Sequence, residues 1–139
     1  MSRRRAIVFG SRDFAARWIV MAVLNELSVE HQLYVVQGGA RGADEIAHKW
    51  AHAHDVDHKT FHAAWKTHHP DWCDGGCRGA PKGYCSVAGH RRNQQMLDKG
   101  RPDLAIGFSS NKNLTPGTAD MSRRIEKAGI PLYTVRSHS

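Results

Sequence analysis

The chain has 139 residues, of which 24% are charged and 40% apolar, and its formal net charge is +7. We predict one domain, 1–139, that is large enough to bury a core, with the composition of a globular protein rather than a fibrous or disordered one. No apolar run is long enough to span a membrane, so we expect a cytoplasmic protein without a membrane partner. The positive charge favours an anionic ligand, although arginines scattered over a solvated surface would give the same total.

The first elements that the sequence predicts are a strand and a helix. The run RAIVFGSR, 5–12, is short and apolar and ends in a glycine turn, which is typical of a buried strand. Residues 13–28 carry apolar side chains at helical spacing. We therefore predict a helix there, with Trp18 in the core and Asp13 as its N-cap.

A second strand and a second helix follow. The run QLYVVQGG, 32–39, predicts another buried strand, and residues 44–54 predict a helix with Trp50 on its apolar face. Residues 58–65 predict a weaker third strand that places Trp65 in the core.

The periodic pattern stops at residues 66–89, which are rich in Gly, Pro, Cys and His. A segment of this length without periodicity is rare in a compact domain, so we expect it to be functional or held by a metal. Periodicity returns with a predicted helix at 89–100, a strand at 102–109, a helix at 118–129 and a last strand at 130–135.

Strands and helices thus alternate along the whole chain. This alternation is typical of βαβ units, which place parallel strands in one sheet and helices on both of its faces. We predict an α/β fold, a doubly wound three-layer sandwich with a mainly parallel sheet and a Cys/His-rich insert loop.

Three glycine-rich turns, 10–14, 38–44 and 115–121, are predicted at the carboxyl ends of strands, where open parallel sheets bind ligands. Each turn leads into a helix, whose N-terminus attracts phosphate. Glycine lets the backbone approach an anion, and Arg12 and Arg41 can add forked donors. The turns therefore predict a phosphate cradle; the alternative is that the glycines serve only tight turns and helix packing.

The insert contains a set of candidate zinc ligands. Three thiolates and one imidazole would form a tetrahedral structural site, and we assign them to His69, Cys73, Cys77 and Cys85. His69 is favoured because the proline after it stiffens its approach to Cys73, and His68 is the alternative fourth ligand. Three free thiols in a loop would also explain the pattern.

Several polar residues allow two interpretations. Asp44 can be the N-cap of its helix or can accept hydrogen bonds from a ribose diol. Arg92 and Asn93, near the start of a predicted helix, can bind a phosphate or ribose, or the arginine can face solvent. His48 and His52 lie one helical turn apart and could chelate a metal, but an exposed helix surface is the better interpretation.

The segments GSRDF, GGARGADEIAHKWA, AAW, AGHRRNQQML and GTADMSRRIEKAGIPLYTV resemble the SLOG superfamily, named for the Smf/DprA and LOG proteins. The resemblance is closest to its YspA/YpsA-like branch, which is common in bacteria and phages. It implies a Rossmann-like fold that binds a nucleotide or an ADP-ribose-like signal. It also implies a ligand site made of Gly10, Ser11, Arg12, Gly38, Gly39, Arg41, Gly42, Asp44, Arg92, Asn93, Gly117 and Thr118.

One departure from the family pattern bears on catalysis. Some LOG proteins hydrolyse nucleoside monophosphates and carry a catalytic glutamate in the motif PGGxGTxxE. Here the matching run is PGTADM, and Met121 stands at the position of that glutamate. A thioether cannot act as a general base, so catalysis would need Asp44 or Asp120 instead.

The sequence therefore supports three hypotheses. The first is a binder that senses or sequesters a nucleotide-derived small molecule. The second is a nucleotide N-glycosidase or phosphoribohydrolase of LOG type, and the third is a protein that binds single-stranded nucleic acid. We also expect a homodimer, because the first helix is apolar on more than one side and small SLOG domains commonly pair; if the chain is phage-encoded, it would act in the cytoplasm of the bacterial host.

Overall fold

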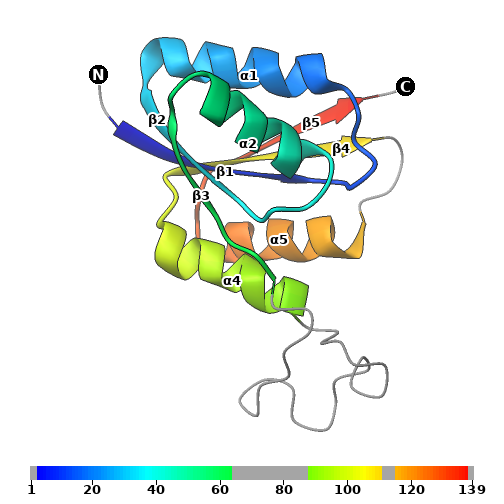
Figure 1. The fold of residues 1–139 in the computed structure, drawn as a ribbon. Coiled ribbons are helices and arrows are strands. Elements are labelled where there is room, and N and C mark those ends of the chain that lie inside the picture. The colour runs from blue at the N-terminus through cyan, green and yellow to red at the C-terminus, as the bar shows by residue number, and fades with distance from the viewer. Residues whose placement is uncertain (1–2, 64–87, 111–114, 138–139) are drawn as a thin grey trace, which may run out of the picture.

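The computed structural model describes residues 3–63, 88–110 and 115–137. Within these ranges, five strands and four helices follow one another along the chain (Figure 1). They are β1 (Arg3–Gly10), α1 (Arg17–Glu30), β2 (Gln32–Gln37), α2 (Ala43–Ala53), β3 (Asp57–Thr60), α4 (Ala88–Gly100), β4 (Leu104–Ser110), α5 (Pro116–Lys127) and β5 (Leu132–Ser137).

The five strands form one sheet in the order β3-β2-β1-β4-β5, and every neighbouring pair is parallel. The strand β1 is central, with Ala6 in register with Val35 of β2 on one side and Leu104 of β4 on the other. From β1 the chain adds β2 and β3 on one side and then returns to add β4 and β5 on the other. The winding therefore reverses between β1 and β4.

The helices cover both faces of the sheet, α1 and α2 on one and α4 and α5 on the other (Figure 1). Alternate residues of β1 enter the two layers: Ala6 and Val8 join the apolar cluster under α1 and α2, whereas Ile7 and Phe9 join the cluster under α4 and α5. All four are at most 4% exposed. Burial on both faces explains why this strand is a continuous apolar run, and it confirms the predicted three-layer α/β fold.

The start of the first helix differs from the prediction. The helix α1 begins at Arg17 after Ala16, so Asp13 is not its N-cap. Residues 11–14 instead form a turn in which the Phe14 amide donates to the Ser11 carbonyl at 3.1 Å, and the Phe14 ring packs against Phe108. This turn places Phe14 in the core, and the helix that follows starts later than predicted.

The prediction for one tryptophan is also wrong. Trp18 was expected in the core but is 72% exposed, since it lies on the outer face of α1. Trp50 is buried as predicted, and its indole N–H donates to Asn25 Oδ1 at 2.9 Å, which ties α2 to α1. Trp65 lies outside the described residues.

The Cys/His-rich insert and its candidate zinc ligands also lie outside the described residues, namely His68, His69, Cys73, Cys77 and Cys85. The zinc site therefore stays a prediction. In the ranges that are described, no three His, Cys, Asp or Glu side chains gather as a metal site would require. None of the described helices combines the length and the apolar character needed to cross a bilayer.

Candidate functional site

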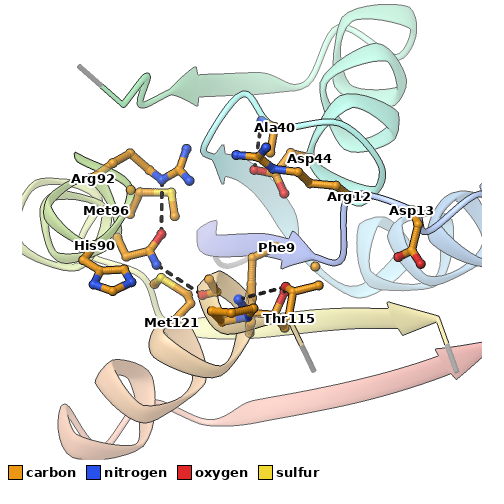
Figure 2. A pocket seen from close by; sticks show the side chains of 16 residues that line it. Phe9, Arg12, Asp13, Ala40, Asp44, His90, Arg92, Met96, Thr115 and Met121 are labelled. Carbon is orange, nitrogen blue, oxygen red and sulfur yellow. Dashed lines mark hydrogen bonds between the residues drawn. The ribbon is translucent and has the colours of Figure 1, made fainter. Parts of the chain in front are cut away.

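A cavity of about 510 Å³ lies beyond the carboxyl ends of β1 and β4, where the winding reverses (Figure 2). Ligands bind at this position in open parallel sheets, because the connections after the two central strands lead to opposite faces. The cavity brings together predicted residues from all three glycine-rich turns and from α4. These are Gly10, Arg12, Asp44, Arg92, Asn93, Gly117 and Thr118.

The remaining predicted residues do not line this cavity. Gly38, Gly39 and Arg41 line a neighbouring cavity of about 300 Å³. Arg12 and Arg92 belong to the walls of both. The two spaces are therefore adjacent, and the arginine pair lies at their boundary.

Two of the predicted glycines are required by the packing of the turns. A Cβ atom on Gly10 would overlap the carbonyl oxygen of Phe108, and one on Gly42 would overlap that of Ser11. Gly42 also has a φ of +80°, a conformation that side chains rarely allow. Ser11 itself is 1% exposed and donates its backbone N–H to Phe108 at 2.9 Å. The packing of the turns therefore needs both glycines, and Gly10 also lines the cavity.

The first glycine after β2 makes room for an arginine. A Cβ on Gly38 would overlap the guanidinium group of Arg92, and Gly39 has a φ of +73°. Arg92 Nη1 donates to the Gly38 carbonyl, and its Nε donates to Asn93 Oδ1 at 3.1 Å. Gly38 thus allows α4 to place its arginine across the end of β2, where it faces the cavity (Figure 2).

The cavity wall carries charges of both signs, with Arg12 and Arg92 beside Asp13 and Asp44. Burial lowers the pKa of Arg92, the negative charge of Asp44 raises it, and the positive charge of Arg12 lowers it again. Two guanidinium groups close enough to disfavour each other's charge would gain from an anion between them. A phosphate offers the planar pairs of oxygens that guanidinium groups bind in bidentate fashion.

The N-terminus of α5 forms the opposite wall. Thr115 is the N-cap, and its hydroxyl accepts from the Thr118 amide at 3.4 Å; Pro116 and Gly117 follow at the first helical positions. A Cβ on Gly117 would meet no atom within 4 Å. Of the predicted glycines that line the cavity, Gly117 is thus the one whose missing side chain leaves open space for a ligand next to helix N–H groups.

Asp44 is a buried carboxyl group in the cavity wall, 3% exposed. The N-cap of α2 is Gly42, so Asp44 is not the helix cap that one interpretation expected. Its Oδ2 accepts from the amides of Gly38 at 2.9 Å and Ala40 at 3.4 Å and so fixes the turn after β2. Burial raises its pKa to about 6, against the opposing effects of Arg92 and of these amides.

The other candidate acid, Asp120, is engaged in hydrogen bonds within the protein. Its Oδ2 accepts from Arg124 Nε at 2.8 Å and from Asn93 Nδ2 at 3.1 Å. Although burial alone would raise its pKa, these hydrogen bonds lower it. Asp120 joins α5 to α4 through Asn93, forms an ion pair with Arg124 and does not line the cavity.

Apolar residues complete the cavity, and the sequence did not single out the first two of them. Phe9 and Met96 line it, and both are also members of the core under α4 and α5. Met121, at the position of the LOG glutamate, is 1% exposed and lines the cavity as well. His90, at the start of α4, is a further polar residue in the wall, and the sequence carried no signal for it beyond its place beside Arg92.

The fold places a cavity at the switch point of the sheet of a Rossmann-like α/β domain. A family model described as the YspA, cpYpsA-related SLOG family matches residues 4–68. The gene 61 protein of Mycobacterium phage D29 is 34% identical over 131 residues, which cover 93% of this chain and 94% of that protein. The chain belongs to the YspA, cpYpsA-related SLOG family.

A solved structure supports the fold independently. DNA processing protein A (DprA) from Streptococcus pneumoniae matches with a TM-score of 0.52 and 17% identity, covering 93% of this chain. This chain spans 58% of the DprA chain. The likeness confirms the Rossmann-like architecture, and the phage relative agrees with the expected occurrence of this branch in phages.

Proposed function

We propose that this domain binds a nucleotide-derived small molecule with an ADP-ribose-like composition, and that it senses or sequesters this ligand without turnover. The observation that carries the proposal is the pairing of Arg12 and Arg92 with the open N-terminus of α5 across one cavity. Membership of the SLOG family supports nucleotide-related binding or processing in general.

The cavity offers a suitable group for each part of such a ligand. Phosphates would lie between the arginines and the amides near Gly117, where the helix dipole favours negative charge. The carboxyl group of Asp44 can accept hydrogen bonds from ribose hydroxyls. The neighbouring cavity beside Arg41 would take a second part of a longer ligand, since it shares Arg12 and Arg92 with the first.

An enzyme of the N-glycosidase or phosphoribohydrolase class is the second candidate, and one observation favours it. A carboxyl group in a ligand cavity with a pKa of about 6 has the property of a general acid or base near neutral pH. Asp120 is the weaker candidate, because Arg124 and Asn93 already occupy its carboxylate. The buried thioether of Met121 favours binding over turnover.

The experiment is an incubation of the purified chain with AMP, NAD, ADP-ribose and cyclic ADP-ribose isomers. Size filtration and mass spectrometry then identify what the protein retains and what it releases. We expect a ligand retained intact. A released base with ribose phosphate would instead establish the enzyme, and Asp44→Asn should then abolish turnover while largely preserving affinity.

Binding of single-stranded nucleic acid in this cavity ranks third. The printed name of the DprA structure refers to DNA processing, and the chain is basic. Strand binding uses exposed aromatic rings on which bases stack. Of the described residues that line the cavity, Phe9 alone has a Phe, Tyr or Trp ring, and it is 4% exposed. This cavity is therefore better suited to a small ligand.

A further inference from the structure

A second cavity, of about 560 Å³, lies apart from the switch point. Its floor comes from the sheet face that α4 and α5 cover, since Arg5 of β1 is in register with Tyr34 of β2, and Lys59 of β3 pairs with Val36 of the buried cluster. The end of α4, including Lys99, and the segment after β3, including Phe61, form its sides.

The charge of this cavity is one-sided. Its walls contain the cations Arg5, Lys59 and Lys99 together with His62, and none of its described lining residues carries a carboxyl group. Lys59 and Lys99 are exposed and have no carboxylate within ion-pair distance among the described residues. At the margin, Arg3 pairs with Asp57 at 3.2 Å. Lys59 and Lys99 are therefore available to an external anion, whereas Arg5 Nη1 donates to the Gly100 carbonyl at 3.1 Å.

Two half-buried aromatic rings lie among these cations. The guanidinium carbons of Arg5 and Arg3 are 4.7 and 5.1 Å from the centre of the Tyr34 ring, and the Lys59 ammonium is 5.9 Å from the centre of the Phe61 ring. Arginine planes and aromatic rings both stack on nucleobases, whereas ammonium groups bind phosphates as point charges. The cavity thus combines groups that can stack on a nucleobase with groups that can bind a phosphate.

We propose that this second cavity binds a segment of single-stranded nucleic acid. Lys59 and Lys99 contact phosphates, and a base stacks on the Phe61 ring or on the Tyr34–Arg5 pair. An acidic peptide would use the cations but not the rings, and a duplex would keep its bases inside its own stack. The proposal is independent of the nucleotide site, because none of these residues lines the first cavity.

The test measures binding of a fluorescently labelled 20-nucleotide oligo-dT to the full chain by anisotropy over a salt series. The test variant is Lys59→Ala/Lys99→Ala. The matched control is Lys49→Ala/Lys127→Ala, which removes the same charge from α2 and from the end of α5. The proposal predicts that the test variant binds about tenfold or more weakly and lowers the logarithmic salt slope by about 1.4, since each lost phosphate contact on a single strand contributes about 0.7.

A second variant separates stacking from charge. Phe61→Leu keeps the side chain apolar and the net charge unchanged, so we expect an unchanged salt slope with about tenfold weaker binding from the lost base contact. Gly117→Ala should leave oligonucleotide binding intact, whether or not the first cavity holds a nucleotide.

Four results would overturn the proposal. The first is no binding of the oligonucleotide, and the second is an equal loss of affinity in the test and control lysine variants. The third is a loss of affinity with Gly117→Ala but not with Lys59→Ala/Lys99→Ala. The fourth is equal affinity for dTMP and the oligonucleotide at this cavity. The last result would reveal a mononucleotide site instead of a strand-binding surface.

Discussion

At the scale of single residues, Asp44 has two roles that oppose each other energetically. Its carboxyl group accepts hydrogen bonds from Gly38 and Ala40 and so holds the turn that positions Arg92. The same burial that makes those hydrogen bonds effective penalises the charged form, which raises the pKa of Asp44 to about 6. A residue that stabilises the turn therefore also carries an electrostatic cost at neutral pH.

This cost predicts a specific pH dependence of stability. The folded-state pKa of Asp44 is raised from its usual 3.8 to about 6. The contribution of Asp44 to the free energy of unfolding is therefore fully present below about pH 4 and is lost as pH rises through 6. A rise of the Asp44 pKa from 3.8 to about 6 corresponds to at most about 3 kcal/mol in the free energy of unfolding. The Asn side chain of Asp44→Asn stays neutral. The free energy of unfolding of this variant should therefore rise by up to this amount relative to the wild type between pH 4 and pH 7.

Urea denaturation of both proteins at a series of pH values measures this difference directly, since all other titrating groups are common to them. A difference in the free energy of unfolding that rises with pH agrees with the raised pKa. Two parallel curves would show that Asp44 titrates normally in the folded protein.

At the scale of elements, the helix α1 shows what periodicity could and could not predict. The helix itself was predicted, because its apolar positions recur at helical spacing. Its start and the burial of Trp18 were wrong, since Phe14 enters the core from a turn before the helix and Trp18 faces outward, whereas Val20 and Leu24 are buried. A contact between Phe14 and a distant residue, Phe108, cannot be read from local spacing.

The exposed face of α1 carries a prediction of its own. Trp18 and Val29 are 72% and 74% exposed, and Met21 is 36% exposed on the same helix. We expect this helix to be the interface of the homodimer. Light scattering should give the mass of two chains for the wild type and of one chain for Trp18→Glu. A wild-type monomer at high concentration would contradict the expectation.

At the scale of the whole molecule, a parallel sheet with helices on both faces could be expected from alternating strands and helices, and most of the cavity from the rule that ligands bind beyond strand ends. The individual roles of the glycines could not be predicted from the sequence. Gly10 and Gly42 are required by backbone groups of Phe108 and Ser11, Gly38 by an arginine 54 residues away, and Gly117 by no protein atom. These roles depend on contacts between distant segments, which a turn sequence does not contain.

The difference between Gly117 and the other glycines gives the most direct test of the nucleotide site. Gly117→Ala adds one methyl group in open space at the start of α5, so the fold should be unaffected or slightly stabilised. The same methyl group would intrude where a phosphate approaches the helix amides. Ser122→Ala, on the same helix but outside the cavity lining, is the matched control.

The decisive measurement is the affinity of wild type, Gly117→Ala and Ser122→Ala for the nucleotide that the chain retains, by isothermal titration calorimetry with melting temperatures recorded in parallel. We predict a loss of affinity of about tenfold or more, or about 1.4 kcal/mol, for Gly117→Ala alone, with no decrease in its melting temperature. Wild-type affinity in Gly117→Ala would contradict the assignment of the ligand to the N-terminus of α5.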